Sequence, residues 1–353
     1  MNLNDVSAFS KLDPQDMLSQ INDLPDQLLS AWEFGLQQDL PDWKDIHQVL
    51  IAGMGGSAIG ADLLASYAAI SSTVPIFVHR DYDLPAWVKD PDTLVIASSH
   101  SGNTEETISA FKAAIANKCR CLVVSTGGKL AQLGADSGLP VWIFKYDGQP
   151  RAAVGFSFGL LLAVISKLHL IPDPDGELKS AVAAMKKQQS HLLAEVPVAD
   201  NLAKRFAGQL MGRWVTVIGS GILSPVARRW KGQISEIAKA WSQFEYLPEA
   251  DHNTLAGVSN PEPLLSSMMV LFLRASTGHP RNLIRSDLTR KIFMLEGIST
   301  DFVDAQGSTP LENLWTCLHL GDYVSYYLAM AYGVDPTPVE AIENFKVELR
   351  SAG

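Results

Sequence analysis

Apolar residues follow two alternating patterns along the chain. Short runs rich in β-branched residues recur, and longer segments with helical spacing separate them. The predicted strands are the runs at residues 48–53, 74–80, 93–99, 121–126 and 140–145, and "EETISAFKAAIANK" at 105–118 is a typical helical segment. Because the runs are apolar on both faces, they indicate a parallel sheet that helices cover on both sides.

Helices are also predicted at both ends of the chain. Leucine and isoleucine residues near helical spacing within 14–40 predict one or two helices. The apolar stretch at 152–166 is too short for a comfortable membrane span and predicts a buried helix. From about residue 310 the pattern predicts a long apolar helix, a break at "GVDPTP" and a short terminal helix.

The first strand, turn and helix have a counterpart later in the chain. The segment "RWVTVIGSGILSPVARRWKGQI" (213–234) follows the same order as "HQVLIAGMGGSAIGADLLASY" (47–67): a strand, a glycine turn containing serine, then a helix. Between them, "LIPDPDGELKS" (170–180) reads as a link between domains. We therefore expect an internal duplication into two α/β domains, residues 1–172 with a helical N-terminal extension and residues 173–353 with C-terminal helices.

Composition narrows the function classes. The net charge of −10 argues against a general nucleic-acid surface. The polar, acidic N-terminus does not resemble a signal peptide. Three cysteines are too few for a disulfide framework, and we expect Cys119 and Cys121 to be buried as small apolar side chains. These features together predict a cytoplasmic protein with no membrane or nucleic-acid partner.

The glycine-rich stretch "GMGGSAIG" (53–60) is the first candidate binding loop. Its glycines would let backbone N–H groups approach an anion at the start of a helix. The spacing also fits a loose dinucleotide fingerprint, with Asp81 or Asp83 as a late candidate for the ribose acid. A tight turn that binds no ligand is the alternative.

The stretch "SSHSGNTEET" (98–107) is a more specific anion site. Ser99, Ser101 and Thr104 can donate hydroxyl hydrogens to phosphate, and Gly102 permits a sharp bend before the next helix. The spacing of Asn103 and Glu106 also fits a capping box, so a simple helix cap is the alternative. A cap needs one or two such residues, and the excess favours phosphate. A second anion loop argues against a dinucleotide ligand.

This second loop resembles the S-x-S-G-x-T loop of sugar isomerase (SIS) domains. Together with "GMGGSAIGADLL", "ADHNTLAG" and "DPTP" in the same order, the chain is similar over nearly its whole length to the bifunctional phosphoglucose/phosphomannose isomerases. The resemblance implies two SIS domains, each a flavodoxin-like sandwich of a parallel sheet between helices. It also implies a homodimer that interconverts glucose 6-phosphate, and mannose 6-phosphate, with fructose 6-phosphate through a cis-enediol. Such a redox-neutral reaction needs no cofactor, and the histidines show no metal-ligand spacing.

The resemblance also assigns substrate-binding residues. It implies that two glycines border the sugar, that four hydroxyl residues hold the phosphate and that an arginine faces the substrate: Gly55, Gly56, Ser57, Ser99, Ser101, Thr104 and Arg151. The chain departs from its relatives at His100, where tyrosine is frequent, and at Ala152, where a bulkier or polar residue is common. Both departures leave the phosphate donors in place and could alter the pocket wall.

The isomerisation requires a base that moves a proton between neighbouring carbons, for which a carboxylate is suited. The resemblance places this base at Glu236 and the ring-opening histidine at His252, supplied across the dimer interface. It directs Lys346 to the ring oxygen and associates Thr337 with acceptance of both C2 epimers. By residue pattern alone, Glu236 could be a solvated helix residue, His252 a loop or interface histidine and Lys346 a surface charge.

Three other functions are compatible with parts of the sequence. A regulatory protein could bind the phosphosugar without catalysis, although a sensor has no need of Glu236 and His252. An isomerase could act on an amino-sugar phosphate instead. A nucleotide-binding oxidoreductase is disfavoured by the second hydroxyl loop.

Overall fold

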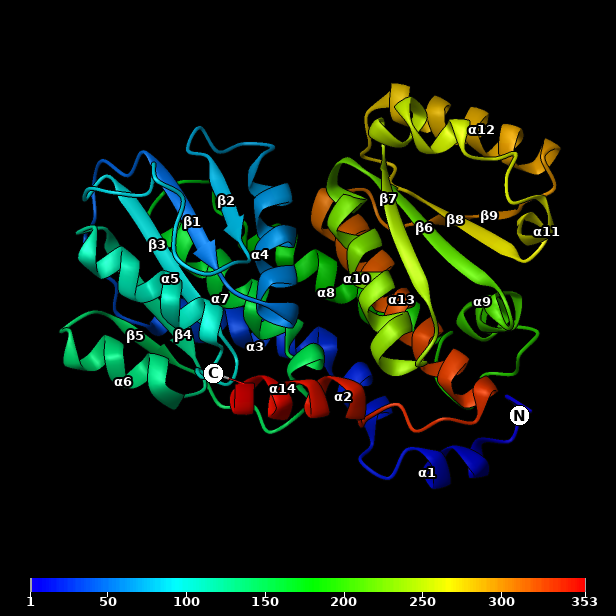
Figure 1. The fold of residues 1–353 in the computed structure, drawn as a ribbon, viewed down its shortest axis with the longest axis horizontal. Coiled ribbons are helices and arrows are strands. Elements are labelled where there is room, and N and C mark those ends of the chain that lie inside the picture. The colour runs from blue at the N-terminus through cyan, green and yellow to red at the C-terminus, as the bar shows by residue number, and fades with distance from the viewer. Residues whose placement is uncertain (1, 353) are drawn as a thin grey trace.

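The computed structural model describes residues 2–352 and contains two parallel β-sheets (Figure 1). The first sheet has the strand order β2-β1-β3-β4-β5, and the second has the order β7-β6-β8-β9. The strands are β1 Gln48–Ala52, β2 Ile76–His79, β3 Thr93–Ser99, β4 Arg120–Ser125, β5 Val141–Ile143, β6 Trp214–Ser220, β7 Ser242–Leu247, β8 Met268–Arg274 and β9 Ser299–Asp304.

The two sheets repeat one topology. The chain enters each sheet at an inner strand, pairs the next strand on one side and then crosses to the other side, with every neighbouring pair parallel. This agrees with the duplication expected from the two strand–turn–helix segments. The boundary between residues 172 and 173 stays a prediction.

Helices surround both sheets, as the alternating pattern predicted. They connect the strands within each sheet and also precede and follow the sheets along the chain. They are α1 Phe9–Leu12, α2 Met17–Asn22, α3 Leu24–Gln37, α4 Gly55–Ala68, α5 Glu105–Ala116, α6 Gly128–Asp136, α7 Val154–Lys167, α8 Asp175–Gln189, α9 Leu202–Leu210, α10 Ser224–Ile237, α11 Glu262–Leu265, α12 Pro280–Leu295, α13 Pro310–Tyr332 and α14 Glu340–Ala352. Short 3₁₀ turns are η1 Val6–Ala8, η2 Pro150–Ala152, η3 Gly221–Leu223, η4 Glu249–His252 and η5 Thr254–Ala256.

The apolar stretches occupy the places expected of them. The run at 152–166 forms most of α7, whose side chains are almost all buried and which packs against α3 and α4. Among residues 2–352 there is no helix with the length and apolar character needed to cross a membrane. Cys119 and Cys121 are buried.

The predicted link at 170–180 is too long. Helix α7 ends at Lys167 and α8 begins at Asp175, so only the first part of the predicted segment is irregular. Asp175 and Glu177 lie in the first turn of α8, where their negative charges stabilise the helix by interacting with the positive end of its dipole. The acidic residues that suggested a linker therefore start a helix.

One apolar core connects the two sheets. It includes α3, α4 and α7 from the first half and α8, α9, α10 and α13 from the second. Helix α4 packs against α10, and Asp62 on α4 accepts a hydrogen bond from Arg228 on α10 at 3.5 Å. Direct packing of α4 on α10 therefore joins the two halves of the molecule.

Candidate active site

The candidate phosphate residues lie beyond the carboxyl ends of the strands in the first sheet. In an open parallel sheet, this edge is where ligands bind, because the loops and helix N-termini converge there. Ser57 follows β1, and the hydroxyl loop follows the adjacent strand β3. The turn that carries Arg151 follows β5. The fold thus brings together three segments that are distant in sequence.

The glycine loop opens α4 and approaches the Arg151 turn closely. Gly55 has a φ of +51° and open space where a side chain would project, so a ligand can come near its backbone. At Gly56 a Cβ atom would lie 2.7 Å from the carbonyl oxygen of Pro150. Ser57 is buried, and its Oγ accepts a hydrogen bond from the backbone N–H of His100 at 3.2 Å. The first loop is therefore fixed to both of the others.

The hydroxyl loop is organised by its own backbone. Ser99 Oγ lies 3.0 Å from Thr104 Oγ1 and accepts the N–H of Gly102 at 3.2 Å. Ser101 Oγ accepts the N–H of Asn103 at 3.2 Å. Ser101 accepts from an amide, so its own hydrogen can still be donated to an anion. Within the Ser99–Thr104 pair one hydroxyl donates to the other, so the pair can offer one hydrogen.

The capping alternative for this loop fails in the structure. Thr104 is the N-cap residue of α5, yet its side chain makes no capping hydrogen bond. Asn103 instead accepts the N–H of Lys129 and donates to the carbonyl of Ser101. Gly102 has a φ of +64°, and a Cβ there would lie 1.8 Å from the Gly127 carbonyl oxygen, so only glycine fits the bend.

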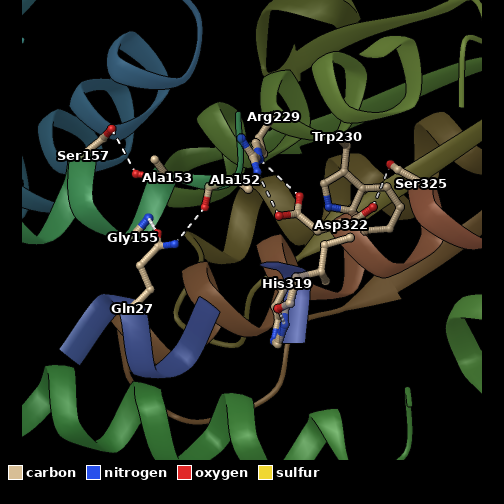
Figure 2. A network of polar contacts seen from close by, with 12 residues as sticks. Gln27, Ala152, Ala153, Gly155, Ser157, Arg229, Trp230, His319, Asp322 and Ser325 are labelled. Atoms are coloured by element: carbon tan, nitrogen blue, oxygen red, sulfur yellow. Dashed lines mark hydrogen bonds and ion pairs between the residues drawn. The ribbon is translucent and has the colours of Figure 1, made fainter. Parts of the chain in front are cut away.

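The turn that carries Arg151 is braced by the N-terminal helices. Gln27 on α3 donates to the Ala152 carbonyl at 3.0 Å and accepts the N–H of Gly155 at 2.8 Å, as Figure 2 shows. Gln20 on α2 accepts the N–H of Gln149 at 2.7 Å. The N-terminal extension thus holds both ends of the turn.

Arg151 joins the first half of the chain to the C-terminal segment. Its side chain is buried, and its Nη2 donates to the carbonyl of Pro336 at 2.9 Å and to that of Thr337. Its Nε has no partner among the described residues. Burial lowers the pKa of Arg151, and the carboxylate of Glu236 opposes that shift. Arg151 is therefore a buried cation with one donor free within residues 2–352.

Glu236 lies in the last turn of α10 and is half-buried. The start of β7 fixes this helix end, since Ser242 Oγ lies 3.3 Å from Ser235 Oγ and donates to the Lys231 carbonyl at 3.0 Å. Glu236 interacts electrostatically with Arg151 and with Lys239, two residues beyond the end of the helix. The candidate base from the second half thus lies near the candidate cation from the first.

Thr337 also belongs to this cluster. It is buried, and its Oγ1 has no partner among the described residues. Its backbone N–H is held by Asp335 at 2.8 Å, and its carbonyl accepts from Arg151. A buried hydroxyl without a partner is unusual in a folded protein, because burial without a hydrogen bond is costly.

Lys346 lies on α14, which follows this segment. Figure 1 shows α14 on the side of the molecule toward which β1 and β3 point. None of the residues from Glu340 to Ala352 is buried. Glu343, which shares a helix face with Lys346, acts electrostatically on Arg151. Helix α14 therefore passes near the cluster, although no hydrogen bond within residues 2–352 joins Lys346 to it.

His252 is not brought into the cluster. It lies on η4, beyond the carboxyl end of β7, whereas Glu236 lies near the amino end of that strand. A strand of six residues spans about 17–20 Å. His252 is exposed, and η4 is tied to α12 by Asp251, which accepts from Arg285 at 2.7 Å and from Thr289 at 2.6 Å. One chain by itself therefore does not place His252 beside Glu236.

His100 and Ala152 are the two positions at which the chain departs from the family that it resembles, and their surroundings differ. The His100 ring meets the rings of Phe144 and Tyr146 edge-on, with centroid distances of 6.0 and 5.9 Å. Burial lowers the pKa of His100. Ala152 is buried, and its carbonyl is the acceptor for Gln27.

Sequence reasoning missed two residues that support the cluster. Gln27 braces the Arg151 turn, and Lys239 lies at the end of α10 beside Glu236. Nothing in the local pattern around either residue distinguishes it from an ordinary helix residue. Only the contacts between distant segments reveal them.

The chain is similar in sequence to known proteins over most of its length. The family model described as "Bacterial phospho-glucose isomerase C-terminal SIS domain" matches residues 199–349. A bifunctional phosphoglucose/phosphomannose isomerase from Caldicellulosiruptor bescii is 38% identical over 94% of this chain and 98% of its own length. Another from Aquifex aeolicus is 34% identical over 90% of this chain and 94% of its own.

Solved structures support the fold. A hypothetical protein from Thermus thermophilus superposes with a TM-score of 0.74 at 17% identity, covering 98% of this chain and 94% of the other. The tagatose-6-phosphate ketose/aldose isomerase of Escherichia coli gives 0.63 at 16% identity, covering 94% and 91%. The fold is therefore that of the phosphosugar isomerases, and by its curated relatives the chain belongs to the family of bifunctional phosphoglucose/phosphomannose isomerases.

Proposed function

We propose that this chain is an aldose–ketose isomerase that interconverts glucose 6-phosphate and mannose 6-phosphate with fructose 6-phosphate. One observation supports the proposal most directly. Arg151 and Glu236, from different halves of the chain, interact electrostatically at the edge of the first sheet where the hydroxyl loops lie. A phosphosugar sensor would need only the loops. The names of the relatives support the same substrates.

The loops would hold the phosphate while the sugar extends toward Glu236. Ser57, Ser101 and the Ser99–Thr104 pair donate hydroxyl hydrogens to the phosphate. Gly55 leaves room for the sugar, while Gly56 lets the loop pack against the Arg151 turn beside it. Backbone amides at the starts of α4 and α5 add partial positive charge. No step of this binding requires a cofactor.

Glu236 would act as the base. Its carboxylate takes the proton from C2 of the open-chain aldose and returns it to C1 of the enediol, while the hydroxyl proton moves from O2 to O1, which yields the ketose. Arg151 would stabilise the negative charge on the enediolate oxygens, and its unpartnered Nε is a donor for that purpose. The buried Thr337 hydroxyl would contact the sugar near C2, the position at which glucose and mannose differ.

Ring opening would require a second copy of the chain. His252 lies at the far edge of the second sheet from Glu236 within one chain, so we propose that the partner subunit of a homodimer supplies it. Lys346 on the exposed helix α14 would reach the ring oxygen. These two groups protonate and deprotonate the ring atoms while Glu236 handles the carbon-bound proton.

An assay of fructose 6-phosphate conversion tests the activity, with glucose 6-phosphate and mannose 6-phosphate measured separately. The wild type should form both products, and a protein that forms neither refutes the proposal. Mixing inactive Glu236→Gln and His252→Ala subunits tests the shared site. If the histidine acts across the interface, the mixed dimer regains one intact site. If both groups act within one chain, the mixture stays inactive.

A further inference from the structure

Lys239 lies where the two halves of the site meet, and the proposed reaction gives it no role. It follows the end of α10 with a φ of +54°. Its side chain reaches back to the helix, where Nζ donates to the carbonyls of Glu236 at 2.6 Å and Ile237 at 3.4 Å, and it also donates to Pro336 at 3.3 Å. An ammonium has three N–H donors, and three carbonyls surround this one.

The contact with Pro336 has a second cation on it. Arg151 donates to the same carbonyl oxygen at 2.9 Å. The Pro336 carbonyl therefore receives donors from both halves of the chain, one from η2 and one from just beyond the end of α10. The cations Arg151 and Lys239 repel each other, and the shared Pro336 carbonyl holds them close by accepting from both.

We propose that Lys239 is a positioning residue for the candidate base Glu236. Lys239 donates to the last carbonyls of α10 and to the Pro336 carbonyl. It thereby fixes the end of α10 relative to the segment of Pro336 and Thr337, to which Arg151 also donates. This inference rests on the proposed role of Glu236 as the base. Lys239 acts through that carboxylate and need not touch the sugar.

The charge of Lys239 makes the arrangement sensitive to pH. Desolvation of the ammonium, and then the nearby Arg151, lower its pKa to about 8, while Asp335 and Glu236 oppose the shift. These three groups, from η2, from the segment after α13 and from α10 itself, are the charged groups that act on it. Loss of the proton removes one donor and the charge that holds the carbonyls, so the link weakens above about pH 8.

Kinetic comparison of Lys239→Met, Lys239→Arg and wild type tests this role. Lys118→Met is the matched control, because Lys118 also follows a helix end with a positive φ, of +59°, but precedes β4 at the opposite edge of the first sheet. We expect Lys239→Met to lower kcat at pH 7 about tenfold, which corresponds to about 1.4 kcal/mol in the barrier, with KM nearly unchanged. Lys118→Met should match wild type.

The pH profile of kcat gives a readout that a purely structural role would not move. Wild type should lose activity above about pH 8, and Lys239→Arg, which keeps its charge, should move that alkaline limb upward by about one pH unit or more. The role is refuted if Lys239→Met equals Lys118→Met at pH 7, or if Lys239→Arg leaves the limb unchanged.

Glu236→Gln separates the two levels of the proposal. If it is inactive while Lys239→Met behaves as wild type, only the positioning role fails. If Glu236→Gln keeps wild-type kcat, the assignment of the base fails and the positioning role with it. Thermal melting of each variant shows whether a lost activity reflects a lost fold. If Lys239→Met does not fold, the alkaline limb of the Lys239→Arg pH profile tests the positioning role instead.

Discussion

The loops after β3 and β8 occupy the same place in two sheets of the same topology, but their hydroxyls face different partners. In the first, Ser99 and Ser101 accept from loop amides, so Ser101 keeps its hydrogen available and the Ser99–Thr104 pair keeps one of its two. In the second, Ser276 and Thr277 donate to the side chain of Asn313, each at 3.0 Å. The two loops therefore differ although their positions in the fold are equivalent: the first can bind an anion, and the second is hydrogen-bonded to α13.

The second half of the chain contributes to the site from the amino edge of its sheet. The loop at the carboxyl edge of that sheet is hydrogen-bonded to α13, while the end of α10, at the amino edge, places Glu236 toward the first sheet. A duplicated fold therefore does not duplicate a site. One half offers loops for the phosphate, and the other offers a helix end for the chemistry.

Glu236→Gln is the strongest test of this division. The amide cannot accept the carbon-bound proton, which lies on C1 when fructose 6-phosphate is the substrate, so we expect kcat to fall about 10³-fold. Binding should change little, because the loops of the first sheet hold the phosphate. The measurement is steady-state conversion of fructose 6-phosphate. A variant that retains wild-type kcat would show that the second half does not supply the base.

Ser99→Ala tests the first loop. Removing a hydroxyl that binds a charged phosphate costs about 1.5–3 kcal/mol, which corresponds to a rise in KM of about 10- to 150-fold. Titration with inorganic phosphate as a competitive inhibitor should show a parallel loss. An unchanged KM together with an unchanged inhibition constant would exclude this loop as the phosphate site.

His319→Gln tests whether α13 serves stability rather than catalysis. His319 is fully buried, and its Nε2 lies 2.8 Å from the Ile21 carbonyl on α2. Burial lowers its pKa to about 4. The unfolded chain therefore binds a proton between about pH 6.5 and 4 that the native state rejects, and native stability falls as pH falls through this range, by up to about 3 kcal/mol.

The variant should remove that part of the pH dependence. Denaturant unfolding at about pH 7 and about pH 4.5 measures it, and kcat at neutral pH serves as the check on catalysis. An identical drop in stability in wild type and variant would show that His319 does not cause the acid sensitivity.

Ser276→Ala should have the smallest effect. It removes the one hydroxyl donor that has Asn313 Oδ1 at 3.0 Å and the Gly307 carbonyl at 3.1 Å as acceptors, so we expect a loss of about 1 kcal/mol in the free energy of unfolding. KM and kcat should equal those of wild type, in contrast to Ser99→Ala. A rise in KM comparable to that of Ser99→Ala would mean that both loops bind the substrate.

Much of this organisation could be predicted from the sequence. The apolar runs located every strand of the first sheet, and the run at 93–99 coincides with β3. The hydroxyl loop was also recognisable, because an excess of donors around Gly102 is a local feature. The linker at 170–180 was misjudged, since acidic residues suit both a loop and the first turn of a helix.

The sequence by itself determined the alternating pattern, the two glycine turns and the hydroxyl loop, because backbone conformation and side-chain chemistry at each are set by near neighbours. Only the tertiary structure decided that Arg151 meets Thr337 and interacts with Glu236, and that His252 lies at the opposite edge. Those relations depend on how α4, α10 and the segment after α13 pack. Contacts between segments so distant in the chain leave no periodic pattern in any one of them.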